Sequence, residues 1–156
     1  MGIIEKKHRL SPEHYVGRIS VAFTLCLKDR ATVFTSAAVV DLFVSMLKDR
    51  ASQYEILIPV YCFMPDHQHL IMKGDNDSVN VLQTLRSYKQ KTGFWLSKNT
   101  PGVRWQKDYY DHIIRNEDKL STHIKYILAN PVRKGLVADW REYPFKGAIG
   151  CELDEW

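Results

Sequence analysis

Four segments of the chain have the residue pattern of β-strands. They are rich in β-branched and aromatic residues, and turn-forming residues separate them. The four segments are residues 15–28, 54–63, 67–73 and 105–115. Only Met64-Pro65-Asp66 lies between the second and the third, so these two are predicted to form a hairpin.

Three other segments have the pattern of helices. The first covers residues 36–49, with a serine as its N-terminal cap, and Ser78 is a suitable cap for a longer second helix. The third helix opens at Asn116. We expect it to end at or before Asn130, because Pro131 disfavours helical geometry in the residue before it.

The order of these elements predicts the fold class. Strand, helix, strand, strand, helix, strand and helix follow one another, which is a split βαβ pattern with one further helix. Such a chain is expected to form an α+β domain with an antiparallel sheet and helices on one face. Since no linker or repeat interrupts the sequence, residues 1–156 are interpreted as one domain, with 1–14 and 147–156 as peripheral extensions.

The distribution of charge favours a polyanionic partner. The net charge is only +4, yet residues 86–134 hold eleven Lys or Arg against four Asp or Glu. Aromatic residues are interleaved with these cations. Cations neutralise phosphates and aromatic faces stack on bases, so this part of the chain suits a nucleic acid. Solvated helix faces and core aromatics explain the same pattern equally well.

Cysteine content and hydropathy bound the location of the protein. Three cysteines far apart in the sequence indicate neither a disulfide framework nor a cysteine-based zinc site. No apolar run reaches the ~18 residues needed to cross a bilayer. The polar N-terminus lacks the pattern of a secretory signal, so a cytoplasmic location without membrane contact is expected.

Two histidines of the third predicted strand are candidate metal ligands. Side chains alternate along a strand, so His67 and His69 point to one face and Gln68 to the other. Two imidazoles on one face of a stiff strand supply two ligands of a divalent-metal site. A His-x-His pair alone is weak support, because structural and surface histidines occur at the same spacing.

A second group of candidates lies on the last predicted helix. Tyr126 and Asn130 are four residues apart and share a helix face, and His123 lies on that face three residues before Tyr126. Taken singly, Tyr126 is equally compatible with core packing, and Asn130 with a helix end before Pro131.

Three motifs that contain these candidates resemble those of one protein family. The motifs are residues 63–71 (FMPDHQHLI), 105–115 (WQKDYYDHIIR) and 126–137 (YILANPVRKGLV). In content, order and spacing they are similar to those of the REP-associated tyrosine transposases. These proteins belong with the small single-tyrosine HUH transposases of bacterial insertion sequences. The resemblance extends over about residues 15–145.

The resemblance implies a fold, a substrate and a chemistry. The fold would be a ferredoxin-like sheet, and the substrate single-stranded DNA beside hairpins, cut through a covalent 5′-phosphotyrosine that frees a 3′-hydroxyl. Tyr126 would be the nucleophile, and His67 and His69 would bind the metal. Asn130 occupies the place of a polar third ligand, often Gln in relatives. Because Asn is shorter, its contact could run through water, or His123 could substitute.

The residue types suit this chemistry on physical grounds. A cation on the non-bridging oxygens of a phosphodiester lowers the barrier to attack by a nucleophile. A tyrosine hydroxyl, with an ordinary pKa near ~10, is a poor nucleophile until a metal or base assists it. Nitrogen and oxygen ligands without a thiolate are compatible with Mg²⁺ or Mn²⁺, and Mn²⁺ suits imidazole better. The family has a hydrophobic residue where this chain has Gln68, which faces away from the metal.

Seven basic residues are candidates for contacts with DNA phosphates, with solvated surface as the equal alternative for each. They are Arg86, Lys89, Arg115, Lys119, Lys125, Arg133 and Lys134.

Two other functions compete with a tyrosine transposase. One is a domesticated or decayed DNA-binding module on the same fold that no longer cleaves; the joint presence of His67, His69 and Tyr126 favours catalysis instead. The other is a different metallohydrolase, but a histidine-triad enzyme would need a histidine in place of Ile71. The motifs are compatible with a homodimer and with a monomer.

Overall fold

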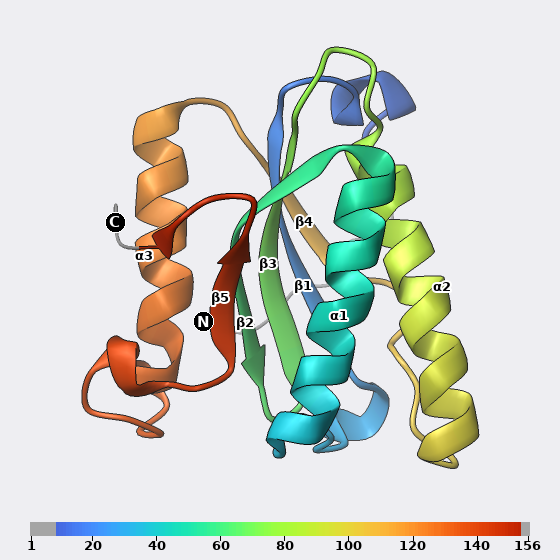
Figure 1. Ribbon diagram of the computed structural model, residues 1–156, viewed down its shortest axis with the longest axis vertical. Coiled ribbons are helices and arrows are strands. Elements are labelled where there is room, and N and C mark those ends of the chain that lie inside the picture. Colours follow the sequence, from blue (N-terminus) through green and yellow to red (C-terminus); the bar gives the residue numbers. More distant parts are fainter. Residues whose placement is uncertain (1–8, 154–156) are drawn as a thin grey trace.

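A five-stranded antiparallel sheet forms the centre of the protein (Figure 1). The computed structural model describes residues 9–153. The strands are β1 (Ser20–Cys26), β2 (Ile56–Met64), β3 (His67–Gly74), β4 (Tyr110–Ile114) and β5 (Lys146–Ile149). The helices are α1 (Ala37–Tyr54), α2 (Val81–Asn99) and α3 (Glu117–Arg133), and short 3₁₀ helices cover Pro12–Tyr15, Lys28–Arg30 and Trp140–Glu142. The strand order β4-β1-β3-β2-β5 confirms the predicted α+β class with a ferredoxin-like antiparallel sheet.

The helices cover both faces of this sheet. α1 and α2 lie together on one face, and α3 lies on the other (Figure 1). The expectation of helices on one face holds for α1 and α2, and the position of α3 corrects it. The physical reason is that the central strands are apolar on both sides: Leu70 and Met72 face α1 and α2, whereas Ile71 packs with Ile124 of α3. Both faces must therefore be shielded from water.

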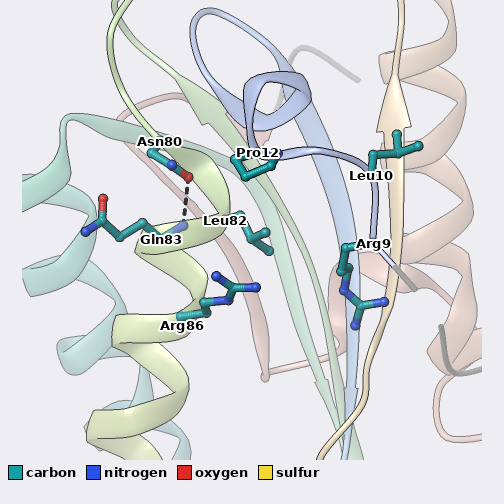
Figure 2. A pocket seen from close by; sticks show the side chains of 7 residues that line it. All are labelled: Arg9, Leu10, Pro12, Asn80, Leu82, Gln83 and Arg86. Carbon is teal, nitrogen blue, oxygen red and sulfur yellow. Dashed lines mark hydrogen bonds between the residues drawn. The ribbon is translucent and has the colours of Figure 1, made fainter. Parts of the chain in front are cut away.

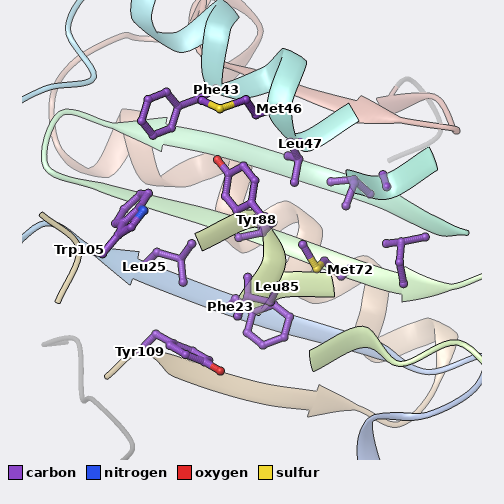
Figure 3. Packing of buried hydrophobic residues seen from close by; sticks show 14 of the residues in the cluster. Phe23, Leu25, Phe43, Met46, Leu47, Met72, Leu85, Tyr88, Trp105 and Tyr109 are labelled. Atoms are coloured by element: carbon purple, nitrogen blue, oxygen red, sulfur yellow. The ribbon is translucent and has the colours of Figure 1, made fainter. Parts of the chain in front are cut away.

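The larger apolar core lies between the sheet and the helices α1 and α2 (Figure 3). Trp105 and Tyr109 belong to this core and are almost fully buried. The Trp105 indole Nε1 donates a hydrogen bond to Thr92 Oγ1 at 2.8 Å. These two aromatic residues are therefore packing residues and not exposed stacking surfaces.

Several element ends differ from the sequence prediction. The hairpin of β2 and β3 is confirmed, since Met64 pairs with His67 across a turn of Pro65 and Asp66. Helix α2 is capped not by Ser78 but by Asn80.

The predicted fourth strand shortens to Tyr110–Ile114, and the chain before it meets the continuation of β1 only through an isolated bridge of Trp105 with Leu27. Lys89 Nζ donates to the carbonyls of Gln106 and Lys107 at 3.1 and 3.4 Å. Strand β5 was not predicted. Residues 147–149, expected to be peripheral, lie in this strand at the β2 edge of the sheet.

Within residues 9–153, no helix is long and apolar enough to cross a membrane.

Helix α3 continues through Pro131 to Arg133, so the prediction that it ends by Asn130 is wrong. Pro131 lies in the last turn, so its missing N–H removes a single helical hydrogen bond, and the burial of the residue offsets this loss. The helix stops at Gly135, which has a φ of 74°. Leu136 N–H donates to the Pro131 carbonyl at 2.9 Å, and Gly135 N–H donates to the Val132 carbonyl at 3.0 Å. These two bonds form a Schellman motif.

The polar side chain of Gln68 lies in the larger core, on the face opposite the histidines, as the strand alternation predicts. It is fully buried, and its Oε1 accepts a hydrogen bond of 2.7 Å from the Tyr88 hydroxyl of α2. Its Nε2 has no hydrogen-bond partner among residues 9–153. Gln68 is therefore tolerated because Tyr88 satisfies its carbonyl, and half of the amide remains unsatisfied.

We predict that Tyr88→Phe lowers the free energy of unfolding by about 1–3 kcal/mol, because it leaves the Gln68 carbonyl buried without a donor. The double variant Tyr88→Phe/Gln68→Met should recover this loss, since it removes both unsatisfied atoms of the amide. Urea unfolding of the two variants and the wild type measures the difference. A double variant as unstable as Tyr88→Phe would contradict the assigned pair.

We also predict that Gly135→Ala destabilises the protein by about 1–2 kcal/mol, the cost of a left-handed conformation for a residue with a Cβ. An added Cβ would meet no atom within 4 Å, so the change reports on the backbone alone. Gly135→Asn is the matched control, because Asn tolerates this conformation better than Ala. Thermal unfolding should rank the wild type first, Asn next and Ala last; equal stability of all three would refute the role of Gly135 as the helix stop.

Candidate active site

The side chains of His67 and His69 converge on the α3 face of the sheet. Their Nε2 atoms lie 3.2 Å apart, and their rings are nearly perpendicular, at 89°. His67 is almost completely buried, and His69 is largely buried. The pair arises directly from strand alternation in β3, as the sequence predicts.

The Nδ1 atom of each ring has its own polar neighbour. His67 Nδ1 lies 2.6 Å from Asp66 Oδ1, and Asp66 also forms an ion pair of 3.1 Å with Arg30. His69 Nδ1 lies 3.0 Å from the Thr24 hydroxyl of β1, which stands opposite His69 in the register of the two strands. Sequence reasoning missed both partners. Asp66 is recognisable as a neighbour of His67, but nothing in the sequence gives the register that selects Thr24.

The surroundings of the two imidazoles keep them neutral. Burial lowers the pKa of His67 although Asp66 opposes this effect. Burial, with the adjacent His67 and the charge of Arg133, lowers the pKa of His69 to about 3. Near neutral pH, neither ring carries a charge, so each retains one unprotonated nitrogen. A neutral imidazole is the form that binds metals.

The histidine pair suits a divalent cation. Two nitrogens 3.2 Å apart can both lie ~2.1 Å from one ion. Both Nδ1 atoms are already bound to polar partners, the usual arrangement around metal-binding histidines. Among residues 9–153, no cluster of three or more His, Cys, Asp or Glu side chains could hold a metal. Within this part of the chain, a further protein ligand would be of another residue type.

The C-terminal half of α3, which packs on the sheet face that bears the histidines, carries a tyrosine and an amide, and two cations follow at its end. Tyr126 is 48% exposed, whereas Asn130 is buried. The Arg133 guanidinium lies 4.0 Å from the centre of the Tyr126 ring, and it donates to the Tyr126 carbonyl at 2.9 Å and to Asn130 Oδ1 at 3.4 Å. After burial, which is the main cause, the charge of Lys134 also lowers the pKa of His67, and the charge of Arg133 lowers that of His69.

His123, the alternative third ligand, packs elsewhere. Its ring stacks on His112 of β4, with the ring centres 5.0 Å apart and an angle of 27° between them. His112 pairs with Ala22 of β1, so it lies two strands away from β3, about 10 Å across the sheet. Of the two candidates, Asn130 is the one that accepts a hydrogen bond from Arg133, which also donates to the Tyr126 carbonyl.

The seven predicted DNA-contacting cations fall into two groups. Five are exposed and belong to α3 or its two ends, along about 25 Å of helix. These are Arg115, Lys119, Lys125, Arg133 and Lys134. The other two, Arg86 and Lys89, belong to α2 on the opposite face of the sheet. Lys89 binds carbonyls of the segment before β4, as described above.

Arg86 borders an open hollow of about 510 Å³ between α2 and the N-terminal segment (Figure 2). Leu82 and Gln83 of α2 also line it, and Arg9 and Pro12 face them from the N-terminal side. Arg9 is engaged in the structure, since it donates to the Tyr109 carbonyl and lies 3.7 Å from the Asp111 carboxylate. This hollow is separate from the histidine pair, so the structure does not unite all predicted cations in one site.

Comparisons with known proteins agree with the fold and the sequence motifs. The family model described as "Transposase IS200 like" matches residues 15–130. A Haemophilus influenzae protein provisionally named REP-associated tyrosine transposase is 28% identical over 150 residues, which cover 86% of this chain and 85% of the relative. The REP-associated tyrosine transposase of Escherichia coli K12 is 32% identical over 91 residues, or 56% of this chain and 52% of the relative.

A solved structure shares the fold. It is a REP-associated tyrosine transposase bound to a REP hairpin, and it superposes with a TM-score of 0.74 at 22% identity, over 90% of this chain and 81% of the other. The resemblance to REP-associated tyrosine transposases is thus confirmed. Because the family match spans most of the chain and includes His67, His69, Tyr126 and Asn130, this protein belongs to the IS200-like transposase family of enzymes.

Proposed function

We propose that this chain is a metal-dependent single-stranded DNA endonuclease and strand transferase that cuts beside DNA hairpins through Tyr126. The observation that carries the proposal is the convergence of two neutral imidazole nitrogens, 3.2 Å apart, on the sheet face covered by α3, whose C-terminal half carries an exposed tyrosine and exposed cations. A nucleophile, a metal-binding pair and phosphate-attracting charge are the groups that a cut in a phosphodiester requires.

His67 and His69 would hold a divalent cation through their Nε2 atoms, and Asn130 would supply an oxygen directly or through water. The donor set of nitrogen and oxygen atoms suits Mn²⁺ or Mg²⁺. When bound, such a cation draws charge from the phosphate oxygens and lowers the barrier to attack. Asp66 and Thr24 orient the two rings from behind, at 2.6 and 3.0 Å.

Tyr126 would attack the phosphorus atom of the DNA backbone. The bond from Tyr126 Oη to phosphorus forms while the bond from phosphorus to the 3′ oxygen breaks. The phenol loses its proton, and the departing 3′ oxygen takes one up as a hydroxyl. The chain then carries a 5′-phosphotyrosine. Arg133 covers one face of the Tyr126 ring and adds positive charge where the phosphate would lie.

The five exposed cations of α3 and its ends would follow the DNA backbone toward this site. The structurally similar transposase is bound to a REP hairpin, which supports a hairpin as the DNA element recognised here. The contacts of these cations with phosphates carry no base specificity, so they position the strand and do not select it.

We predict that Tyr126→Phe abolishes a covalent protein–DNA adduct, because phenylalanine lacks the attacking oxygen. The wild type, incubated with hairpin-containing single-stranded DNA and Mn²⁺, should give an adduct on a denaturing gel. Tyr54→Phe of α1, on the other face of the sheet, is the matched control and should behave as the wild type. An adduct that persists in Tyr126→Phe would exclude this residue as the nucleophile.

We predict that His67→Ala lowers the nicking rate by at least ~10²-fold, as removal of a group that stabilises a charged transition state does. Removal of metal with EDTA should have the same effect on the wild type. DNA binding in a mobility-shift assay should change little in either case, and the exposed His14→Ala is the control. Undiminished nicking by the wild type in EDTA would refute the metal dependence of the reaction. Binding without nicking by the wild type would favour a DNA-binding module that has lost cleavage.

A further inference from the structure

A continuous row of hydrogen-bonding groups runs through the two histidines. Thr24 Oγ1 lies 3.0 Å from His69 Nδ1, the two Nε2 atoms lie 3.2 Å apart, and His67 Nδ1 lies 2.6 Å from Asp66 Oδ1. Each of the four ring nitrogens therefore has a polar neighbour within hydrogen-bond distance. The two ends of the row differ in chemistry, since one is a carboxylate and the other is a hydroxyl.

The carboxylate end fixes the direction of every bond in the row. A carboxylate only accepts, so His67 Nδ1 carries the hydrogen and donates to Asp66. A neutral imidazole has one N–H, so His67 Nε2 is bare and accepts. His69 Nε2 must then carry its ring's hydrogen and donate to His67. His69 Nδ1 is left bare and accepts from the Thr24 hydroxyl.

The two histidines therefore differ in whether Nε2 has a free lone pair that could bind a cation. His67 already presents a free lone pair on Nε2. His69 holds its hydrogen on Nε2, the atom that would bind the cation, and it must first exchange to the form protonated on Nδ1. In that form, Nδ1–H needs an acceptor, and Thr24 Oγ1 is the atom beside it. A hydroxyl can both donate and accept, whereas a carboxylate at this position could only accept.

We propose that Thr24 is a positioning residue that serves both tautomers of His69: its hydroxyl donates to Nδ1 in the metal-free protein and rotates to accept from Nδ1–H when Nε2 binds a divalent cation. The second half of this proposal rests on the proposed function. The protons balance, because Nε2 releases one to solvent, Nδ1 takes one from solvent, and Thr24 keeps its own.

The position of Thr24 in the sheet suits this role. Thr24 stands opposite His69 in the pairing of β1 with β3, and it is 7% exposed. The register of two hydrogen-bonded strands holds the hydroxyl beside the ring without the help of a flexible loop. Loss of the hydroxyl would leave a largely buried Nδ1–H without an acceptor in the metal-bound form, which disfavours that form.

The tautomers can be measured in the metal-free wild type by long-range ¹H–¹⁵N correlation of ¹⁵N-labelled histidine, with signals assigned by His67→Gln and His69→Gln. We expect His67 to be protonated on Nδ1 and His69 on Nε2. A His69 ring whose single hydrogen is on Nδ1 would overturn the proposal, whichever tautomer His67 adopts. This measurement needs neither metal nor a Thr24 variant.

Calorimetric titration with Mn²⁺ tests the second half of the proposal. Thr24→Val should weaken binding by about 10-fold or more, the usual effect of removing a partner that orients a metal-binding histidine. Thr24→Ser keeps the hydroxyl and should bind as the wild type does. Ser20→Ala, on the same strand and face but four residues away, is the control for a change in β1.

The outcomes separate this proposal from the proposed function. If Thr24→Val binds Mn²⁺ as tightly as the wild type, or if Thr24→Ser binds as weakly as Thr24→Val, the role of Thr24 in metal binding is refuted. If the wild type itself binds no Mn²⁺, metal dependence of the enzyme fails, and the metal-bound role of Thr24 fails with it. The tautomer spectrum of the metal-free protein then still decides whether Thr24 donates to His69.

Discussion

Strand β3 lies between β1 and β2, so most of its side chains are buried on the face to which alternation directs them. His67, His69 and Ile71 are directed toward α3, while Gln68 and Leu70 are directed toward α2. A shift of one residue in the register would exchange the two sets. The site and the apolar clusters on both faces therefore depend on the register in which β3 pairs with β1 and β2. The polar side chains at the start of β3 each have a hydrogen-bonding neighbour: Asp66 for His67, Tyr88 for Gln68 and Thr24 for His69.

The partners of the histidines explain how two imidazoles remain side by side in a largely buried place. Charged rings at this separation would repel each other, and burial disfavours charge, so both rings stay neutral. Each Nδ1 finds a polar group, from the hairpin turn at Asp66 and from β1 at Thr24. Both Nε2 atoms are then directed to the same point. The site is thus organised by the sheet before any cation or DNA arrives.

Helix α3 determines what meets the histidines from the other side. Its apolar stripe, with Ile124 and Leu128, packs in the smaller apolar cluster between the sheet and α3 and fixes the rotation of the helix. That rotation leaves Tyr126 half exposed and buries Asn130. The helix must reach Arg133 to place its last cations near the site, which is why its continuation through Pro131 matters. A helix that ended earlier would have left Arg133 in a loop.

The sequence by itself determined the α+β class, the hairpin, the shared face of His67 and His69 and the family, because alternation and motif spacing are local properties. Tertiary structure decided the rest. The side of the sheet that α3 covers, the continuation of that helix past Pro131 and the addition of β5 depend on packing between distant segments. The pairing of Thr24 with His69 depends on strand register, and the separation of Arg86 from the histidines depends on which face α2 covers. Such contacts join residues far apart in the chain, and no local pattern encodes them.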